Sequence, residues 1–320
     1  MNFKLPAILC LGLGIMAESS TGFGAVANDG VDIVKEMTDS VVCREADGTE
    51  ITLKKHPQRV VICYGSLVGI WYCAGGRAIA GPDVTSITTL PEAARKLSSV
   101  GSFNNPNVEQ ILLLKPDLVL LVAQQGKHRA VREILNQNHI PSLMVNYENY
   151  RDFTHLLELF CRINGASPAT VPGAQKIIAE VAAVTTKAKT LSHPRFMTLF
   201  TGHGVTVETS SGNASAMAEL LGGENIVKES RGTSVKFSME KVALENPDLI
   251  LVVTMGNQLK LKEKLQAGLM SDPIWGQLRA VKNGRVYFLP NELFLYKANE
   301  RFPEAFRQLA KLMYPQEKWE

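Results

Sequence analysis

The side chains best placed for chemistry are two acids, Glu109 and Glu240, which occupy the same position of a motif that occurs twice in the sequence. Each copy has a residue suited to cap a helix (Asn107 or Ser238), the Glu two positions later, a Pro-Asp pair and then an apolar run. The helix dipole favours a carboxylate in the first turn by about 0.3–1 kcal/mol, so capping alone explains one such acid. It does not explain why both halves place an acid at the same point. Two matched carboxylates would suit docking to a two-fold symmetric partner that presents arginines.

The sequence contains no constellation of residues typical of an enzyme. It lacks the G-x-S-x-G nucleophile motif, the H-E-x-x-H zinc motif and the phosphate-binding G-x-x-x-x-G-K-[ST] loop. Its six histidines show no i,i+4 spacing that would place two metal ligands on one helix face. We therefore predict no catalytic residue, no protein-held metal and no cofactor. The alternative is an exported enzyme whose catalytic residues are distant in sequence.

Composition places the chain among ordinary globular proteins. A length of 320 residues fits about two domains. Hydrophobic residues make up 45% and charged residues 20%, which argues against extensive disorder. The net charge of +3 is small and the basic residues are spread along the chain, whereas nucleic-acid binders concentrate them. We expect two globular lobes and no nucleic-acid partner.

The N-terminal segment 1–27 is predicted to be a signal peptide. Residues 5–17 form an apolar stretch too short to cross a bilayer, and a small-x-small cleavage sequence ends at Ala27. Cys10 raises the alternative of lipidation, which the two bulky residues before it disfavour. No later apolar run is long enough to cross a membrane, so we expect the mature protein to be exported and soluble.

Export places the cysteines in a compartment where disulfides form. Cys43, Cys63, Cys73 and Cys161 remain after cleavage, and they lack the paired C-x-x-C spacing of a zinc site. Cys63 and Cys73 lie in apolar segments, where a buried free thiol is the expected state. One disulfide among the four stays an open alternative, and the sequence does not determine which two would pair.

Predicted strands and helices alternate along the chain, which is the pattern of an α/β fold. Unbroken apolar runs such as 118–122 and 249–253 are typical of parallel strands buried on both faces. A hairpin is predicted near the start of the mature chain, around the turn at Asp47-Gly48. These patterns predict central parallel sheets with an added β arm.

The chain divides at a long amphipathic segment. Apolar residues at spacings of three and four predict one helix from Pro168 to Leu191, within a connecting segment 166–192. Residues 28–165 are then the N-terminal lobe with its β arm, and residues 193–320 the C-terminal lobe. We predict two Rossmann-like lobes bridged by this single long helix. A stiff helix, with no Gly/Ser-rich hinge, would not favour large closing motions.

Six short segments of the sequence occur together in one known family. They are Pro57-Gln58-Arg59-Val60-Val61, Val100-Gly101-Ser102-Phe103, Asn105-Pro106-Asn107-Val108-Glu109, Leu114-Lys115-Pro116-Asp117-Leu118-Val119-Leu120, Gly222-Gly223-Glu224-Asn225-Ile226-Val227 and Asn246-Pro247-Asp248. In these segments the chain resembles the periplasmic binding proteins that serve iron-siderophore, haem and cobalamin importers. The resemblance covers nearly the whole mature chain. It implies two lobes joined by one helix, a ligand between them and delivery to an ABC transporter, with Glu109 and Glu240 contacting the permease dimer.

A ligand between the lobes should meet the loops at the carboxyl ends of the strands. Arg231 would suit an anionic chelate or a propionate because a guanidinium matches a carboxylate, although a surface arginine beside Glu229 is an equal alternative. Tyrosines in these loops could stack on a flat ligand, ligate a metal or simply pack, and His203 is the candidate for direct metal contact. The predicted ligand-binding residues are Tyr64, Ser66, Phe103, Gln125, Tyr147, His203, Arg231, Met255 and Tyr296.

From this resemblance we expect a monomeric periplasmic protein that captures a metal chelate and delivers it to an ABC importer. A ferric siderophore is the favoured ligand, and cobalamin or haem are the alternatives. A receptor that signals without transport is a further alternative.

Overall fold

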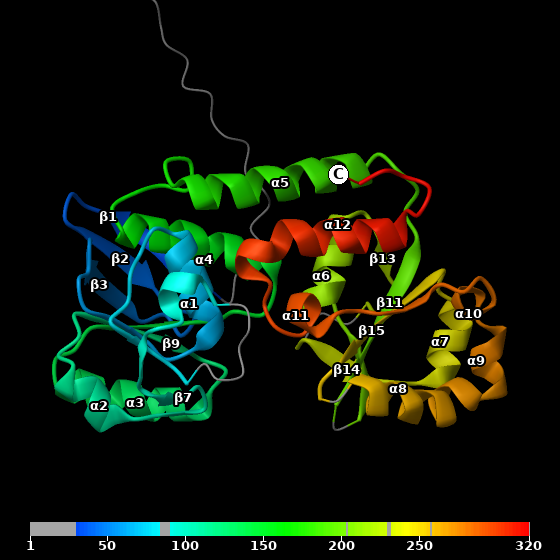
Figure 1. Ribbon diagram of the computed structural model, residues 1–320, viewed down its shortest axis with the longest axis horizontal. Coiled ribbons are helices and arrows are strands. Elements are labelled where there is room, and N and C mark those ends of the chain that lie inside the picture. Colours follow the sequence, from blue (N-terminus) through cyan, green and yellow to red (C-terminus); the bar gives the residue numbers. More distant parts are fainter. Residues whose placement is uncertain (1–29, 84–89, 203, 229–231, 257, 320) are drawn as a thin grey trace, which may run out of the picture.

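The two repeated apolar runs become buried strands of two separate sheets. The structure is a computed structural model that describes residues 30–83, 90–202, 204–228, 232–256 and 258–319. Its two halves lie side by side in Figure 1, each built around a sheet with helices. The runs form β9 (Leu118–Val122) and β15 (Leu249–Thr254), and every residue of both strands is buried. Burial on both faces is what an apolar run without alternation predicts.

The N-terminal half contains a five-stranded sheet in the order β10-β9-β4-β5-β6, and all its neighbouring strands are parallel. Its elements are β4 (Val60–Ile62), α1 (Gly65–Cys73), β5 (Ala80–Gly81), the 3₁₀ helix η1 (Glu92–Ala94), β6 (Ser98–Ser99), β7 (Gly101–Ser102), β8 (Asn105–Pro106), α2 (Val108–Leu113), β9, α3 (Gly126–Gln137), β10 (Ser142–Val145) and α4 (Tyr150–Ile163). The short strands β7 and β8 pair only with each other, as an antiparallel hairpin. The predicted parallel sheet is therefore confirmed in this half.

The C-terminal half contains a mixed sheet in the order β14-β12-β11-β15-β16, with β13 beside β11. Strands β13, β15 and β16 extend the parallel part, whereas β12 and β14 run antiparallel to their neighbours. The predicted central parallel strands are therefore present in this half too, and the antiparallel strands β12 and β14 extend the sheet at one edge. The few residues between β11 and β12 are too short for the crossover that a parallel neighbour needs. The elements are β11 (Arg195–Thr201), β12 (Val205–Glu208), α6 (Asn213–Leu220), β13 (Glu224–Asn225), β14 (Ser234–Lys236), α7 (Met239–Glu245), β15, α8 (Gln258–Ala267), η2 (Leu269–Ser271), α9 (Pro273–Gln277), α10 (Arg279–Lys282), β16 (Val286–Phe288), α11 (Asn291–Phe294), η3 (Asn299–Arg301) and α12 (Phe302–Met313).

The β arm is a three-stranded antiparallel sheet in the order β1 (Asp32–Glu36), β2 (Ser40–Arg44) and β3 (Glu50–Lys54). The hairpin between β2 and β3 is the one predicted around Asp47-Gly48. The Asp47 carboxylate accepts a hydrogen bond of 2.9 Å from the backbone N–H of Thr49 and so fixes the turn. Strand β1 has no clear signal in the sequence, because its residues are mostly exposed and show little alternation.

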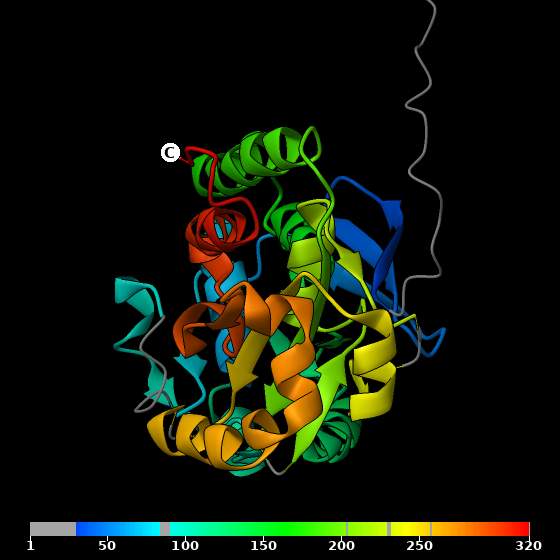
Figure 2. The same cartoon turned by 90° about the vertical axis from the view of Figure 1, so that its right-hand side faces the viewer.

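Helix α5 (Pro172–Ala188) runs above both halves in Figure 1, and Figure 2 shows it lying over α12. The helix is shorter than predicted at both ends, and before it Ser167 and Thr170 form a turn in which Thr170 N donates a 2.9 Å hydrogen bond to Ser167 O. Pro172 is the first residue of the helix. The backbone N–H at this position has no partner within a helix, so proline, which lacks it, loses no hydrogen bond there. An ion pair of 2.9 Å between Glu180 and Arg307 joins α5 to α12.

The two halves share one hydrophobic core along α1, α4, α6 and α12. Tyr150 of α4 makes edge-on contacts with Phe302 and Phe306 of α12, with ring centroids 4.9 and 4.8 Å apart. Two further apolar clusters lie within the separate halves. Separating the halves would expose the shared core to water, so this arrangement opposes large hinge motion.

The cysteines of the described chain all carry free thiols. Burial raises the pKa of Cys63 to about 12, so this thiol stays protonated and unreactive. Across the described ranges, no helix is both long enough and apolar enough to cross a bilayer. The same ranges contain no cluster of three or more His, Cys, Asp or Glu side chains that could hold a metal ion.

Candidate ligand cavity between the two halves

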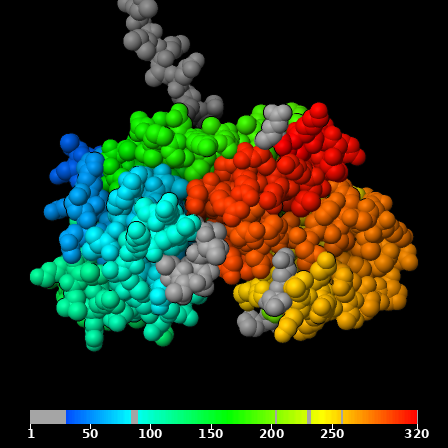
Figure 3. Space-filling view, viewed as in Figure 1, coloured from blue at the N-terminus to red at the C-terminus, as the bar shows by residue number. Residues whose placement is uncertain are grey.

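A cavity of about 140 Å³ lies between the two halves. The N-terminal half contributes residues that follow closely on β4, β9 and β10, and the C-terminal half contributes the loop after α11. The carboxyl ends of parallel strands are where open α/β sheets bind ligands. In Figure 3 a notch separates the two halves on the side away from α5. The cavity is lined by Tyr64, Ser66, Gln124, Tyr147, Glu148, Leu295, Tyr296 and Lys297.

The structure brings four of the predicted ligand residues together around this cavity: Tyr64, Ser66, Tyr147 and Tyr296. They come from both halves, as a site between lobes requires. Tyr296 is exposed although it is large and partly apolar, and such exposure suits a side chain that contacts a ligand.

The other predicted ligand residues do not line the cavity. Phe103 is exposed and stands beside it, with its ring centroid 6.0 Å from that of Tyr64. Gln124 lines the cavity, whereas its neighbour Gln125 precedes the first residue of α3. Met255 is exposed just past the end of β15. His203 and Arg231 lie outside the described residues.

Lys297, which is not among the predicted ligand residues, supplies a positive group to the cavity. Its ammonium donates a hydrogen bond to the backbone oxygen of Glu148 and lies 5.7 Å from the centroid of the Tyr147 ring. Burial lowers the pKa of Lys297, and the carboxylates of Glu148, Glu208 and Asp152 oppose that shift. A cation held at low hydration attracts an anion more strongly than one in bulk water. Lys297 thus gives the cavity a positive group, beside the acidic Glu148 that also lines it.

Two phenols of the cavity, those of the buried Tyr147 and the partly buried Tyr64, are held in their neutral form. Burial raises the pKa of Tyr64, and the Glu148 carboxylate adds to the effect. Burial likewise raises the pKa of Tyr147 well above its usual value. The Tyr147 hydroxyl is also engaged within the protein, because it donates a 2.8 Å hydrogen bond to Oδ1 of Asn299. In the protein without a ligand these phenols are therefore neutral groups suited to hydrogen bonding and packing.

A buried carboxyl group lies behind the cavity. Glu208, the last residue of β12, accepts a 3.0 Å hydrogen bond from the backbone N–H of Ser215. Burial raises the pKa of Glu208 to about 7, while that hydrogen bond and the charge of Lys297 act in the opposite direction. The charge near the cavity therefore depends on pH in the neutral range.

The two repeated acids lie where the motif predicted them, in the first turns of α2 and α7. Asn107 caps α2 by accepting a 3.1 Å bond from Gln110 N, and Ser238 caps α7 by accepting a 3.3 Å bond from Lys241 N. Glu109 and Glu240 are both exposed. Hydrogen bonds from the backbone N–H of Glu240 and from the Ser238 hydroxyl lower the pKa of Glu240. Helix α2 lies at the lower left of Figure 1, and α7 lies in the right half beside the sheet, with both helices below α5 and α12.

The rest of the motif fixes each helix to the start of one strand of the central sheet in its own half, β4 or β11. Asp117 accepts backbone bonds of 2.7 and 2.8 Å from Gln58 and Arg59, and the Arg59 guanidinium donates to the carbonyl oxygen of Leu114. In the second half, the backbone N–H of Arg195 donates 3.0 Å to Asp248, and its guanidinium donates to the carbonyl oxygen of Glu245. In both halves an arginine thus holds the carboxyl end of the helix that carries the repeated acid.

The cavity residues that sequence reasoning missed have little signal in the sequence. Lys297 and Leu295 lie in a loop that follows the short helix α11, without any recognisable motif. Only the adjacent Tyr296 marked that loop. Asn299 is buried by contact with the other half, which no local pattern could indicate.

The fold and sequence match a family of known binding proteins. Residues 60–293 match the family described as periplasmic binding protein. The uncharacterized ABC transporter substrate-binding lipoprotein YvrC of Bacillus subtilis is 28% identical, and the match covers 98% of each chain. The high-affinity heme uptake system protein IsdE of Staphylococcus aureus is 25% identical, over 73% of this chain and 80% of that protein.

Solved structures share the fold at lower identity. The periplasmic vitamin B12 binding protein BtuF of Vibrio cholerae has a TM-score of 0.64 at 18% identity, with 82% of this chain and 99% of that chain covered. The periplasmic catecholate-siderophore binding protein VctP of Vibrio cholerae has a TM-score of 0.62 at 21% identity, with 87% and 100% covered. Because the family match spans most of the chain and the central sheets of both halves, the chain belongs to the periplasmic binding protein family.

Proposed function

We propose that this protein is the substrate-binding component of an ABC importer and that it captures an anionic metal chelate between its two halves. The observation that carries the proposal is the cavity that both halves build, with Lys297 as its cation. The family match supports the transport role, and curated relatives include an ABC transporter substrate-binding lipoprotein and a heme uptake protein. The protein acts by binding and release, without turnover, and works as a monomer.

The cavity is the floor of a larger site. Pockets that enclose drug-sized ligands usually measure about 300–1,000 Å³, and this cavity of about 140 Å³ is smaller. A chelate would therefore place one polar group against Lys297 and extend outward past the exposed side chains of Tyr296 and Phe103. A ferric siderophore with carboxylate or catecholate oxygens suits this arrangement best. Haem, with two propionates, is second, and cobalamin, whose side chains are mainly amides, gains least from the lysine.

The ligand class is tested by what the protein carries when it is purified from cells grown with low iron. The absorbance spectrum and the mass of the copurifying molecule distinguish ferric siderophores, haem and cobalamin. We expect an iron chelate with anionic oxygens, and its affinity is then measured by titration with the purified compound. A protein that binds none of these three classes in titrations would contradict the proposal.

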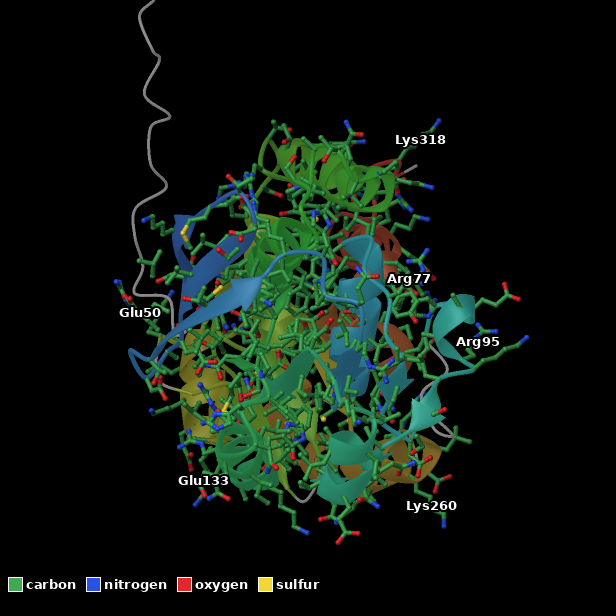
Figure 4. All side chains as sticks on the ribbon, turned by 90° about the vertical axis from the view of Figure 1, so that its left-hand side faces the viewer. Glu50, Arg77, Arg95, Glu133, Lys260 and Lys318 are labelled. Carbon is green, nitrogen blue, oxygen red and sulfur yellow. The ribbon has the colours of Figure 1, made fainter. Side chains whose placement is uncertain are left out.

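We further propose that Glu109 and Glu240 dock the protein to arginines on the permease dimer. The support is their matched position, their exposure and the identical fastening of their helices. Changing both to Lys should abolish uptake while ligand affinity stays unchanged, because charge reversal places like charges against the arginines. The control is Glu133→Lys, since Glu133 lies on the outer side of α3, as Figure 4 shows. Normal uptake by the double variant would refute the docking assignment.

The protein is exported to the periplasm, and its signal peptide is cleaved after Ala27. The sequence of residues 1–27 supports this, and the relative YvrC is named a lipoprotein, so lipidation at Cys10 is the competing outcome. The mass of the mature protein decides between the two. Cleavage after Ala27 gives an unmodified chain that starts at Asn28, whereas lipidation gives a heavier chain that starts at Cys10.

A further inference from the structure

Two leucines project into solvent at the same position of the repeated motif. Leu113 of α2 is 81% exposed and Leu244 of α7 is 84% exposed, more than any other large apolar side chain in the described ranges. Each follows the repeated glutamate by four residues, so Glu109 and Leu113 share one helix face, as do Glu240 and Leu244.

The opposite side of each helix faces the protein core. Ile111 and Val242, midway between the acid and the leucine in each copy, are both buried. Each helix thus packs against the protein through this buried apolar residue, as a surface helix ordinarily does through its apolar side. The leucines are therefore not needed to attach the helices, and burial within this chain does not explain them.

Chance exposure explains one such leucine but not the pair. Single apolar side chains on a surface are normal and need no special account. Here the same residue type recurs beside the same acid, on helices that an arginine fixes in the same way in both halves. Surfaces that repeat on both halves of one chain are suited to a partner that presents one matching surface twice, as a two-fold symmetric dimer does.

We propose that Glu109 with Leu113 and Glu240 with Leu244 form two equivalent docking edges, and that each edge fits an arginine beside an apolar socket on a two-fold symmetric partner. The partner is the membrane permease dimer, so this inference rests on the proposed function. No ion pair joins either glutamate to another residue in the described part of the chain, and the Glu240 carboxylate accepts a 2.9 Å bond from its own cap, Ser238. Both carboxylates therefore keep capacity for an outside cation.

The two members of each edge have different tasks. The glutamate steers the encounter and sets the register, and its contribution falls as salt is added. The leucine removes apolar surface from water, which salt does not screen, and it keeps water away from the neighbouring ion pair. Loss of one buried leucine should reduce affinity by about 10-fold or more, and loss of both should approach the product of the two effects.

The test uses the full-length mature protein and the permease–ATPase complex in lipid nanodiscs. The variant Leu113→Gln/Leu244→Gln keeps good helix formers and removes the apolar groups. The matched control is Leu259→Gln, because Leu259 is 74% exposed on α8 and lies outside the motif. We measure the dissociation constant for the nanodisc complex at low and high salt, uptake in cells, and binding of the copurifying chelate.

We expect the double leucine variant to bind the complex at least about 100-fold more weakly at both salt concentrations. It should keep the chelate affinity of the unchanged protein, and Leu259→Gln should behave like that protein in every measurement. Wild-type docking by the leucine variant, together with failed docking by Glu109→Lys/Glu240→Lys, would overturn this inference and leave the proposed function intact. Wild-type docking by both variants would reject the proposed docking surface as a whole.

Discussion

The hydroxyl of Tyr147 donates a 2.8 Å hydrogen bond to the side-chain oxygen of Asn299, and this bond crosses from one half of the protein to the other. Asn299 is buried, and its side-chain nitrogen donates a 3.1 Å bond to the backbone oxygen of Ser66. Its backbone has a φ of 49°, a left-handed conformation that Asn adopts more readily than most residues. One residue of the C-terminal half thus holds two residues that line the cavity, and so fixes the relative position of its walls.

Removing the Tyr147 hydroxyl should therefore weaken the joint between the halves. Tyr147→Phe leaves the Asn299 oxygen buried without a partner, which costs about 1–3 kcal/mol in the free energy of unfolding. Urea unfolding measures the loss. Asn299→Gly permits the left-handed backbone and removes both bonds, so adding Tyr147→Phe to that variant should cost much less than it costs alone. Additive losses would show that the two side chains are not coupled.

The close contact between α1 and the side chain of Asn299 leaves no room for a side chain at Gly69. A Cβ atom on Gly69 would lie 2.3 Å from the side-chain nitrogen of Asn299, closer than atoms can approach. Gly69→Ala should destabilise the protein by about 1–3 kcal/mol through overpacking. Gly276→Ala in α9 is the control, because a Cβ there meets nothing within 4 Å. A lower melting temperature for Gly69→Ala alone is the expected result, and equal melting temperatures would contradict the packing described.

Glu208 makes stability fall as the pH rises toward neutrality. Burial raises its pKa to about 7 from 4.5, so between these values the folded protein binds more protons than the unfolded chain. The free energy of unfolding then decreases with increasing pH, by roughly 1–3 kcal/mol across the window. Glu208→Gln removes this contribution.

The contribution of Glu208 is measured as the difference in the free energy of unfolding between the unchanged protein and Glu208→Gln. Burial lowers the pKa of His128, and a lowered histidine pKa makes stability rise with pH in the same range. Subtracting the unfolding free energies of Glu208→Gln from those of the unchanged protein at each pH cancels such other groups. A difference that stays constant from about pH 4.5 to 7 would mean that the Glu208 carboxyl is not held neutral by burial.

Lys297 should set the preference for anionic ligands. Lys297→Met removes the cation and keeps a long apolar stem, so affinity for an anionic ferric chelate should fall by about 10- to 100-fold, whereas affinity for cobalamin should change little. Lys282→Met, on an exposed position of α10, is the control. Fluorescence titration gives the dissociation constants. An equal loss for both ligand classes would indicate damage to the cavity and not the loss of a charge contact.

Local patterns in the sequence determined much of the fold. The runs that became β9 and β15, the caps at Asn107 and Ser238 and the hairpin at Asp47-Gly48 depend on neighbours in the chain, and all were predicted. The repeat also located the exposed acids, because a helix start is a local signal. The length of α5 was overestimated at both ends, because Leu191 continues the apolar spacing past the observed end at Ala188 and residues 167–170 form a hydrogen-bonded turn before the helix.

The tertiary structure decided which residues share the cavity. Tyr64 and Tyr147 could be named from the carboxyl ends of strands, but Lys297 and Asn299 become neighbours of those residues only when the second half packs against the first. It also decided that Gln124 and not Gln125 lines the cavity, because a one-residue step changes where a side chain points. Burial and charge at such a site depend on groups that are distant in the sequence. A local sequence pattern does not indicate which of these groups become neighbours in space.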